Sequence, residues 1–412
     1  MSPTPVTAEN TFSLAGKQLK LDTAKSIESY LGDLDVQKNV VKIDFSGNTI
    51  GIDASEALAK AILKHSSTIE EIDFSDLYTG RLNTEIPQSL DHLLNALLEC
   101  PNLTTINLSD NAFGLQAIEP IEAWLAKAVS IEHLILSNNG MGPFAGARIG
   151  KSLYKLAQEK KKQGKNCLKT FVCGRNRLEN GSVNYLAIGL RAHKDLEAVR
   201  LYQNGIRPAG ISKLLLQGLS YNSKLKILDL QDNTITTSAA VGLVTALKAW
   251  PELVELNLND CLLKPKGSLL LVERLLEGEK RPAFEKLKLQ YNELEGDALE
   301  KLVKAVDEKL PNLKLLELNG NRFEEDSEHA DAITAIFESR GNGELDELDD
   351  LEEPDSEDEE DDDDDDEDPV AQEGDDANLD QLEKELAGVS IEDKDKNVDA
   401  LADELASTHI RN

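Results

Sequence analysis

The sequence has few of the residues and segments that would indicate a disulfide framework, a zinc site or a leader peptide. Its 412 residues include four cysteines and six histidines, and none stands at the short paired spacings typical of disulfide-rich domains or zinc sites. The start, MSPTPVTAENTFSL, has neither a basic region nor an apolar run, and no stretch approaches ~18 apolar residues. We therefore expect no bound metal, no signal peptide and no membrane span, and the unpaired cysteines indicate a reducing compartment inside the cell.

Basic residues are also missing from one part of the chain. Of the formal net charge of −33, residues 344–368 contribute −20, with twenty acidic residues and no Lys or Arg. Residues 369–412 add −8, so that residues 1–343 carry only −5. Such dense like charge prevents packing, so we expect the acidic segment 344–368 to be disordered. No basic face favours nucleic acid as a partner.

What the sequence does contain is a repeated pattern, L-x-L-x-x-N-x-L, which runs from about Ile43 to Phe323. Most successive copies are 28 or 29 residues apart. This period is typical of leucine-rich repeats, in which each copy is one strand and one helix that cannot bury its apolar face alone. The motif asparagines are Asn48, Asn111, Asn139, Asn176, Asn204, Asn233, Asn292 and Asn321, and Cys261 occupies the same position in a further copy.

Each copy combines a strand pattern with a helix pattern. Apolar residues alternate just before the asparagine, which predicts a short strand with one buried face. The residues after it follow helical spacing, as in Leu243, Ala246, Leu247 and Trp250, and Pro251 ends that helix. Strands and helices differ in width and in rise, ~3.3 and ~1.5 Å per residue, so that stacked copies curve.

The predicted fold class is therefore an α/β solenoid, a leucine-rich-repeat horseshoe of about eleven β-α units. We expect the parallel sheet on the concave face and the helices on the convex face. Residues 1–343 form the repeat domain, residues 344–368 the acidic segment, and residues 369–412 a C-terminal tail. Cys173 falls on an inward strand position and Cys261 on the asparagine ladder, so both are predicted to be buried.

Three departures from the period mark special segments. A spacing of 37 residues between Asn139 and Asn176 places an insertion at EKKKQGKNC. Leu77 replaces the asparagine of one copy, which then has an enlarged strand exit, DLYTGRLNTEIP. A weaker copy, TFSLAGKQL, caps the N-terminal end. In the tail, Leu379, Leu382 and Leu386 follow helical spacing, which fits either a helix that forms on a partner or a solvated, weakly helical segment.

The best candidate for a functional surface is the row of residues directly before the ladder positions. Stacked strands place these residues along one edge at roughly 4.8 Å per strand, and an evenly spaced polar edge suits a protein partner. The alternative is that most of them are simply solvated. The row comprises Gly47, Asp76, Asp110, Asn138, Arg175, Gln203, Asp232, Asp260, Tyr291 and Gly320, and the row beside it comprises Ser75, Ser109, Ser137, Tyr202, Gln231, Asn259, Gln290 and Asn319.

Two residues on this edge stand out, although spacing alone favours a solvated role for each. Asn138 precedes the ladder residue Asn139, which leaves its amide exposed and able to donate and accept. Arg81 lies on the enlarged exit loop, and a loop that breaks the repeat pattern is a natural place for function.

A self-contained catalytic site is not evident in the chain. The segment GPFAGARIGKSL approaches the phosphate-loop pattern G-x-x-x-x-G-K-[ST], but Ala145 stands where the first glycine is required. Its apolar residues also fit the start of a convex-side helix. We therefore expect no nucleotide binding there.

Many segments, in order over residues 40–350, match one known family. They are DLYTGRLNTEIP, LSDNAFG, LSNNGMGP, VCGRNRLENGS, YQNGIRP, LDLQDNT, LNDCLL, LQYNE, LNGNRF and RGNGELDELDD. In these segments the chain resembles the Ran GTPase-activating proteins, in the short form without a C-terminal modifier-attachment domain. The resemblance implies an eleven-repeat crescent that accelerates GTP hydrolysis by the Ran GTPase in nucleocytoplasmic transport.

The resemblance also implies roles for particular residues. The partner docks on the strand-exit edge, where Asn138 contacts and orients the GTPase's own catalytic glutamine. Arg81 belongs to the same interface, as a catalytic or a docking residue, and no arginine finger is used. Asp76, Asp110, Arg175 and Gln203 lie on this edge as partner-binding residues.

Cofactors, partners and location follow from the same resemblance. GTP and magnesium belong to the partner, so this chain is a GTPase activator without a cofactor or a catalytic site of its own. We expect a cytoplasmic monomer that binds Ran in its GTP form and Ran-binding transport factors, but neither nucleic acid nor membrane. The acidic tail either attracts basic patches on these partners or aids solubility.

Two other classes compete with this interpretation. A non-catalytic scaffold or inhibitor of the ribonuclease-inhibitor type has a similar repeat length but is very rich in cysteine, whereas this chain has four. Acidic leucine-rich nuclear phosphoproteins also join repeats to an acidic tail, but their repeats are fewer and shorter. The scaffold remains the main alternative.

Overall fold

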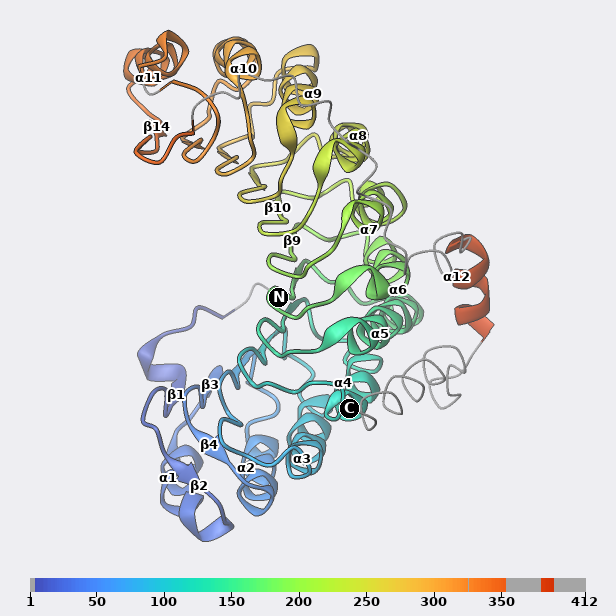
Figure 1. Cartoon of the computed structure of the whole chain (residues 1–412). Coiled ribbons are helices and arrows are strands. Elements are labelled where there is room, and N and C mark those ends of the chain that lie inside the picture. Colours follow the sequence, from blue (N-terminus) through green and yellow to red (C-terminus); the bar gives the residue numbers. More distant parts are fainter. Residues whose placement is uncertain (1–3, 325, 353–378, 389–412) are drawn as a thin grey trace, which may run out of the picture.

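The computed structural model describes residues 4–324, 326–352 and 379–388 and has the shape of a crescent (Figure 1). Strands line its inner side and helices its outer side. Each unit contains one helix, which packs against the helices of the neighbouring units. The predicted leucine-rich-repeat horseshoe is confirmed.

Twelve of the described strands form one parallel sheet, in the order β1-β3-β5-β6-β7-β8-β9-β10-β11-β12-β13-β14. The middle residue of each three-residue strand pairs with the middle residue of the next, and from Ile43 to Leu316 these residues are fully buried. A two-stranded ladder, β2 (Lys20–Leu21) with β4 (Thr49–Ile50), lies beside the first units. The main strands are β1 (Thr11–Ser13), β3 (Lys42–Asp44), β5 (Glu71–Asp73), β6 (Thr105–Asn107), β7 (His133–Ile135), β8 (Thr170–Val172), β9 (Ala198–Arg200), β10 (Ile227–Asp229), β11 (Glu255–Asn257), β12 (Lys286–Lys288), β13 (Leu315–Glu317) and β14 (Glu344–Leu345).

The convex side consists of one helix for each unit, with short 3₁₀ or π turns after α7 and α8. The predicted helix before Pro251 ends as α8 followed by such a turn, and Trp250 is fully buried with its indole N–H donating to the Leu219 carbonyl oxygen at 3.0 Å. The helices are α1 (Ala24–Val36), α2 (Ile52–Lys64), α3 (Ile86–Leu98), α4 (Ile118–Leu125), α5 (Gly142–Gln163), α6 (Glu179–Ala192), α7 (Pro208–Lys213), α8 (Thr236–Ala246), α9 (Lys264–Glu277), α10 (Gly296–Glu308), α11 (Glu328–Arg340) and α12 (Leu379–Gly388).

Within residues 4–352, eleven strand-helix units from β1-α1 to β13-α11 share one apolar core. The weak N-terminal copy is the first unit, as predicted, since β1 pairs with β3. The sheet continues past residue 343, where the repeats were expected to end, because β14 pairs with β13 and Asp346 accepts the backbone N–H of Leu318 at 2.7 Å. The expected disorder of residues 353–368 lies outside the described residues.

The asparagine ladder holds neighbouring units together. Asn139 accepts the backbone N–H of Asn111 at 3.0 Å, and its own backbone N–H donates to Asn176 Oδ1 at 2.9 Å. Each ladder asparagine is buried, because its amide satisfies backbone groups that the tight turn leaves without partners. Cys261, also buried, continues the ladder by placing its Sγ 3.2 Å from the Leu230 carbonyl oxygen. The predicted burial of both Cys173 and Cys261 is confirmed.

The inserted residues lengthen a helix rather than a loop. The helix α5 has 22 residues and ends at Gly164, whose φ of 64° suits a glycine cap. Lys160 near this end is fully buried and donates to the carbonyl oxygens of Val129, Ile131 and Asn166 at 2.9, 2.6 and 2.9 Å. None of the helices described here is long and apolar enough to cross a membrane.

Candidate functional site

The strand-exit edge is a continuous backbone ladder. From Gly47 to Tyr291, each residue of the predicted row donates its backbone N–H to a carbonyl oxygen of the next unit, at 2.8 to 3.1 Å. All ten residues of the row are left-handed, with φ between 47° and 71°. The structure therefore places these side chains in register along one edge, with the same backbone orientation in every unit.

The left-handed backbone separates two kinds of residue on this edge. Asn, Asp and Gly adopt positive φ at little cost, so the backbone alone accounts for Asn138 and its acidic neighbours. Arg175, Gln203 and Tyr291 are not favoured there, at a cost of about 1 kcal/mol each. Their side chains are thus present for a reason other than backbone preference, which makes them candidates for contact with a partner.

Asn138 is exposed, and its side-chain amide is held in one orientation. Its Nδ2 donates to Asp110 Oδ1 at 2.8 Å, so the carboxylate of the preceding unit occupies one amide proton. Among the described residues, nothing donates to its Oδ1. Asn139, the next residue, is fully buried in the ladder. The pair thus presents one oriented, available amide oxygen on the edge.

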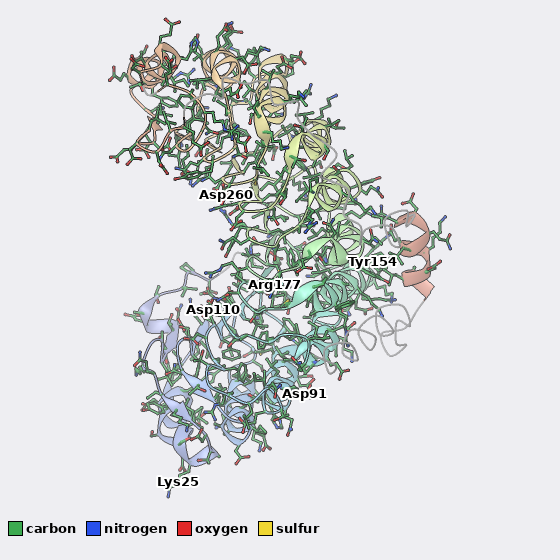
Figure 2. All side chains as sticks on the ribbon, in the orientation of Figure 1. Lys25, Asp91, Asp110, Tyr154, Arg177 and Asp260 are labelled. Atoms are coloured by element: carbon green, nitrogen blue, oxygen red, sulfur yellow. The ribbon has the colours of Figure 1, made fainter. Side chains whose placement is uncertain are left out.

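The neighbouring edge residues differ in how they are bonded. Arg175 is exposed, and its guanidinium forms no ion pair within the described part of the chain. Gln203, one unit further, donates to Asp232 Oδ2 at 2.7 Å, and Asp76 accepts the hydroxyl of Thr79 at 2.5 Å. In Figure 2, Asp110 and Asp260 lie on the side of the crescent away from the helices. The middle of the edge therefore combines a free cation with oriented polar groups.

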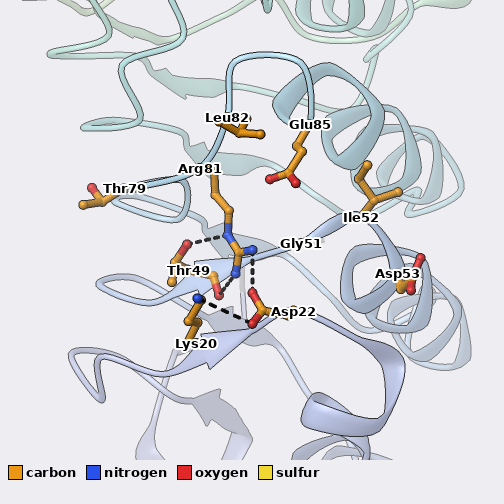
Figure 3. Close-up of a pocket in the computed structure, with 11 residues that line it drawn as sticks. Lys20, Asp22, Thr49, Gly51, Ile52, Asp53, Thr79, Arg81, Leu82 and Glu85 are labelled. Atoms are coloured by element: carbon orange, nitrogen blue, oxygen red, sulfur yellow. Dashed lines mark hydrogen bonds and ion pairs between the residues drawn. The ribbon is translucent and has the colours of Figure 1, made fainter.

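Arg81 is tied into the N-terminal units rather than extended into solvent. Its Nη1 pairs with Asp22 Oδ1 at 2.6 Å, and its Nε and Nη2 donate to Thr49 Oγ1 and to the Thr49 carbonyl oxygen at 2.7 and 3.1 Å (Figure 3). The side chain is only 9% exposed. Gly51 lets the backbone after β4 lie close to the backbone of Asp22, because a Cβ at this position would lie 2.8 Å from the Asp22 carbonyl oxygen. Arg81 thus holds the enlarged loop against β2 and β4.

An open pocket of about 750 Å³ surrounds this arginine. Its rim includes Leu82, which is 65% exposed and therefore offers an apolar contact on the enlarged loop. The lining residues are Lys20, Asp22, Thr49, Gly51, Ile52, Asp53, Thr79, Gly80, Arg81, Leu82 and Glu85. Neither Asp22 nor Leu82 was predicted from the sequence, although Leu82 lies in the loop that interrupts the repeat.

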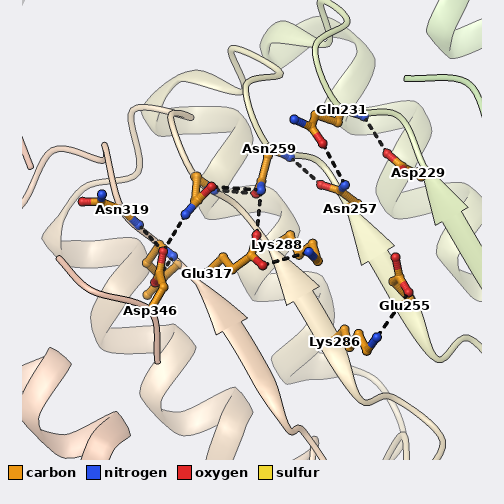
Figure 4. Close-up of polar contacts among 12 residues, drawn as sticks. Asp229, Gln231, Glu255, Asn257, Asn259, Lys286, Lys288, Glu317, Asn319 and Asp346 are labelled. Atoms are coloured by element: carbon orange, nitrogen blue, oxygen red, sulfur yellow. Dashed lines mark hydrogen bonds and ion pairs between the residues drawn. The ribbon is translucent and has the colours of Figure 1, made fainter. Parts of the chain in front are cut away.

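Side chains of the second polar row are hydrogen-bonded to one another and to acidic residues beside them. Asn259 donates to Glu317 Oε2 at 2.7 Å and to Gln290 Oε1 at 3.1 Å, and Gln290 donates to Asp346 at 2.8 Å (Figure 4). Ser109, Ser137 and Asn259 are 6%, 8% and 7% exposed, so these three members of the row do not lie open on the rim, whereas the other five are half-buried. The hydrogen bonds of Asn259 and Gln290 join neighbouring units of the concave side.

The near-match to a phosphate loop lies buried in a helix and not on the edge. Lys151 and Ser152, the end of the near-match to a phosphate loop, are 6% and 2% exposed in the middle of α5. Over the described ranges, no group of three His, Cys, Asp or Glu could hold a metal ion. The edge can therefore position or bind a partner through amides, carboxylates and one arginine.

The chain matches a repeat family and several named proteins. Residues 99–121 and 221–244 match the family model described as Leucine Rich repeat. The chain is 52% identical over 337 residues to Ran GTPase-activating protein 1 of Saccharomyces cerevisiae, covering 80% of this chain and 83% of that protein. It is 43% identical over 205 residues to Ran GTPase-activating protein 2 of Caenorhabditis elegans, covering 49% and 21% of the two chains. A Ran GTPase-activating protein of Drosophila melanogaster is 30% identical over 322 residues, covering 77% and 53%.

Proposed function

Because this chain belongs to the family of Ran GTPase-activating proteins, we propose that it accelerates GTP hydrolysis by the Ran GTPase. The observation that carries the mechanism is the exposed amide of Asn138, fixed by Asp110 at 2.8 Å on the strand-exit edge. In this proposal the edge docks on Ran in its GTP form, and the chain supplies no catalytic site of its own. GTP and magnesium are bound by the partner.

We propose that Asn138 orients the catalytic glutamine of the GTPase. In GTP hydrolysis the protein does little covalent work, so positioning of the attacking water and electrostatics dominate the rate. Since Asp110 holds one amide proton of Asn138, the Asn138 oxygen is free to accept an N–H of that glutamine. The left-handed backbone and its ladder bond to Gly174 at 2.9 Å fix the position of the amide before the partner arrives. Geometry fixed in advance avoids an ordering cost during the reaction.

The proposal does not use an arginine finger, which elsewhere supplies ~10³–10⁵ in rate. To reach a partner's nucleotide, Arg81 would have to break its ion pair with Asp22 and two hydrogen bonds to Thr49. Orientation of the glutamine must then supply a comparable effect, roughly 4–7 kcal/mol at ~1.36 kcal/mol per decade. We assign Arg81 to holding the loop, and Arg175 to docking against an acidic group of the partner.

A single-turnover assay of GTP hydrolysis by Ran, with and without this protein, tests the proposal. We expect strong acceleration by the intact chain and its loss in Asn138→Gly, which removes the amide but keeps a residue suited to positive φ. Asp260→Gly is the matched control, because Asp260 is exposed with a φ of 55° on the same edge, four strands away. If the intact protein gave no acceleration, the non-catalytic scaffold would be the better explanation.

A further inference from the structure

The C-terminal helix α12 packs against the convex side of the crescent, beside α5 and α6 (Figure 1). Its leucines, Leu379, Leu382 and Leu386, lie on one face of the helix because they are three and four residues apart. Leu379 and Leu386 are 2% and 3% exposed. They contact a small apolar cluster, separate from the main core, that contains Tyr154 of α5 and Ile188 of α6.

Charged groups fix both ends of this helix. Arg191 of α6 pairs with Asp380 Oδ1 at 3.0 Å, at the start of α12, and with the carboxylate of Glu383, three residues further along the helix. At the other end, Lys155 of α5 donates to the Leu386 carbonyl oxygen. Because the last carbonyl groups of a helix lack partners within it, this bond caps the helix. The contacts therefore define the direction in which α12 lies, as well as its position.

The helix α12 and the surface of α5 and α6 on which it lies (the seat) have complementary charge. Asp380, Glu383 and Glu385 against Lys384 give α12 a net charge of −2. The seat carries Lys155 and Arg191, with Lys194 next to it, where its Nζ lies 4.9 Å from the ring centre of Tyr221. The guanidinium of Arg191 lies 5.7 Å from the same ring. An acidic helix with a leucine face thus meets an apolar patch bordered by cations.

We propose that this patch on α5 and α6 is a binding site for a short acidic helix with a leucine face, and that its occupant is Leu379–Gly388 of the same chain. Ten residues are too few for a stable isolated helix in water, so α12 forms together with its docking.

Part of this binding site lies on α5. With 22 residues, α5 is the longest helix described, and Tyr154 and Lys155 lie in its second half. Without α12, the side chains of Tyr154 and Ile188 would form an uncovered apolar patch on the convex face. Covering such a patch removes a surface that favours association with other molecules.

Hydrogen exchange of the full chain, followed peptide by peptide, tests the proposal. We expect the backbone amides of residues 379–388 to exchange at least about tenfold more slowly than in an unstructured chain, since they open only when α12 undocks. Leu386→Asp removes an apolar contact from α12 itself, so it cannot unfold the repeats. The expected result is loss of protection in residues 379–388 with unchanged thermal unfolding of the repeats.

A charge reversal locates the seat. Arg191→Glu should remove the protection of residues 379–388, and adding Glu383→Arg should restore part of it by re-forming one ion pair. Lys384→Glu is the matched control, because Lys384 is exposed and should leave the protection unchanged. Exchange of residues 379–388 at the unstructured rate in the unmodified chain, or protection that survives both Leu386→Asp and Arg191→Glu, would overturn the proposal. The readout is independent of GTP hydrolysis, so it does not depend on the proposed function.

Discussion

We expect Asn138→Gly to abolish most of the GTPase activation while leaving the stability of the repeats almost unchanged, and Asn139→Ala to do the reverse. The two residues are adjacent in sequence, but Asn138 is exposed and Asn139 is fully buried. Substituting each in turn therefore separates the amide proposed to act on the partner from the amide that holds the solenoid together.

The cost of Asn139→Ala can be worked out from its bonds. The Asn139 Nδ2 donates to the carbonyl oxygens of Leu108 and Leu136 at 3.0 and 2.9 Å. Each of these oxygens also accepts from a second ladder amide, that of Asn111 or Asn176, at 2.9 Å, so neither is left unsatisfied. The backbone N–H of Asn111 does lose its acceptor, which costs about 1–3 kcal/mol when buried, and each lost bond costs about 0.5–1.5 kcal/mol. The free energy of unfolding should fall by roughly 2–6 kcal/mol.

The cost of changing Asn138 is smaller and has two parts. Loss of its bond to Asp110, on an exposed edge, is worth no more than about 1 kcal/mol. An alanine at this position would lower the stability by about 1 kcal/mol more, because its backbone would have to be left-handed, whereas glycine adopts that conformation without this cost. Asn138→Gly should therefore change stability by less than about 1 kcal/mol. The rate of activated hydrolysis should fall at least about 10²–10³-fold, the effect of removing one preorganised polar group from a reacting centre.

Two measurements check these values: urea unfolding of each variant, and single-turnover GTP hydrolysis by Ran at a temperature where both variants are folded. Because long repeat arrays depart from two-state unfolding, midpoints should be compared together with hydrogen exchange of β6 to β8. Two results would refute the reasoning. Full activation by Asn138→Gly would remove the proposed role of the amide, and a loss of stability equal to that of Asn139→Ala would show that Asn138 also belongs to the ladder.

Three further predictions follow from buried groups. If Arg81 acts only by holding the enlarged loop, Asp22→Ala should reduce activation as much as Arg81→Ala and the double variant no further; additive losses in the hydrolysis assay would indicate a direct role for Arg81. Burial lowers the pKa of His193 from 6.5 to about 3, so that between these pH values the unfolded chain binds a proton that the folded chain does not. The free energy of unfolding should therefore fall as the pH drops from about 6.5 towards 3, by at most about 5 kcal/mol. His193→Gln should flatten that part of the pH dependence of urea unfolding. Burial raises the pKa of Cys173 to about 12 and that of Cys261 still higher, so both thiols should react with a disulfide reagent only at the rate of unfolding, and prompt reaction in the native protein would contradict the buried ladder.

The repeat architecture could be predicted from the sequence because each unit carries its own pattern. Alternating apolar residues, a helical stretch and one asparagine recur at a nearly constant spacing, and only stacking buries all of them. The number of units, the capping first unit, the ladder role of Asn139 and the burial of Cys173 all follow from that period. The end of the sheet did not, because the acidic composition of residues 344–352 concealed the contacts of Asp346 with β13.

The candidate edge was predictable as a row, but the state of each side chain on it was not. Spacing places Asp76, Asp110, Asn138, Arg175 and Gln203 on one edge, because in-register parallel strands end together. It does not show that Asp110 orients Asn138, or that Gln203 bonds to Asp232 while Arg175 has no acidic partner among the described residues. These differences depend on contacts between units about 28 residues apart.

By itself, the sequence determined the solenoid, the order of its units and the edge on which a partner is expected, since those depend on local patterns that repeat. Only the tertiary structure decided what individual polar groups do. Arg81 pairs with Asp22, 59 residues earlier, and Arg191 with Asp380, 189 residues later. Such ion pairs form only when the fold brings distant segments within hydrogen-bond distance, and a periodic sequence pattern does not predict which distant residues come together.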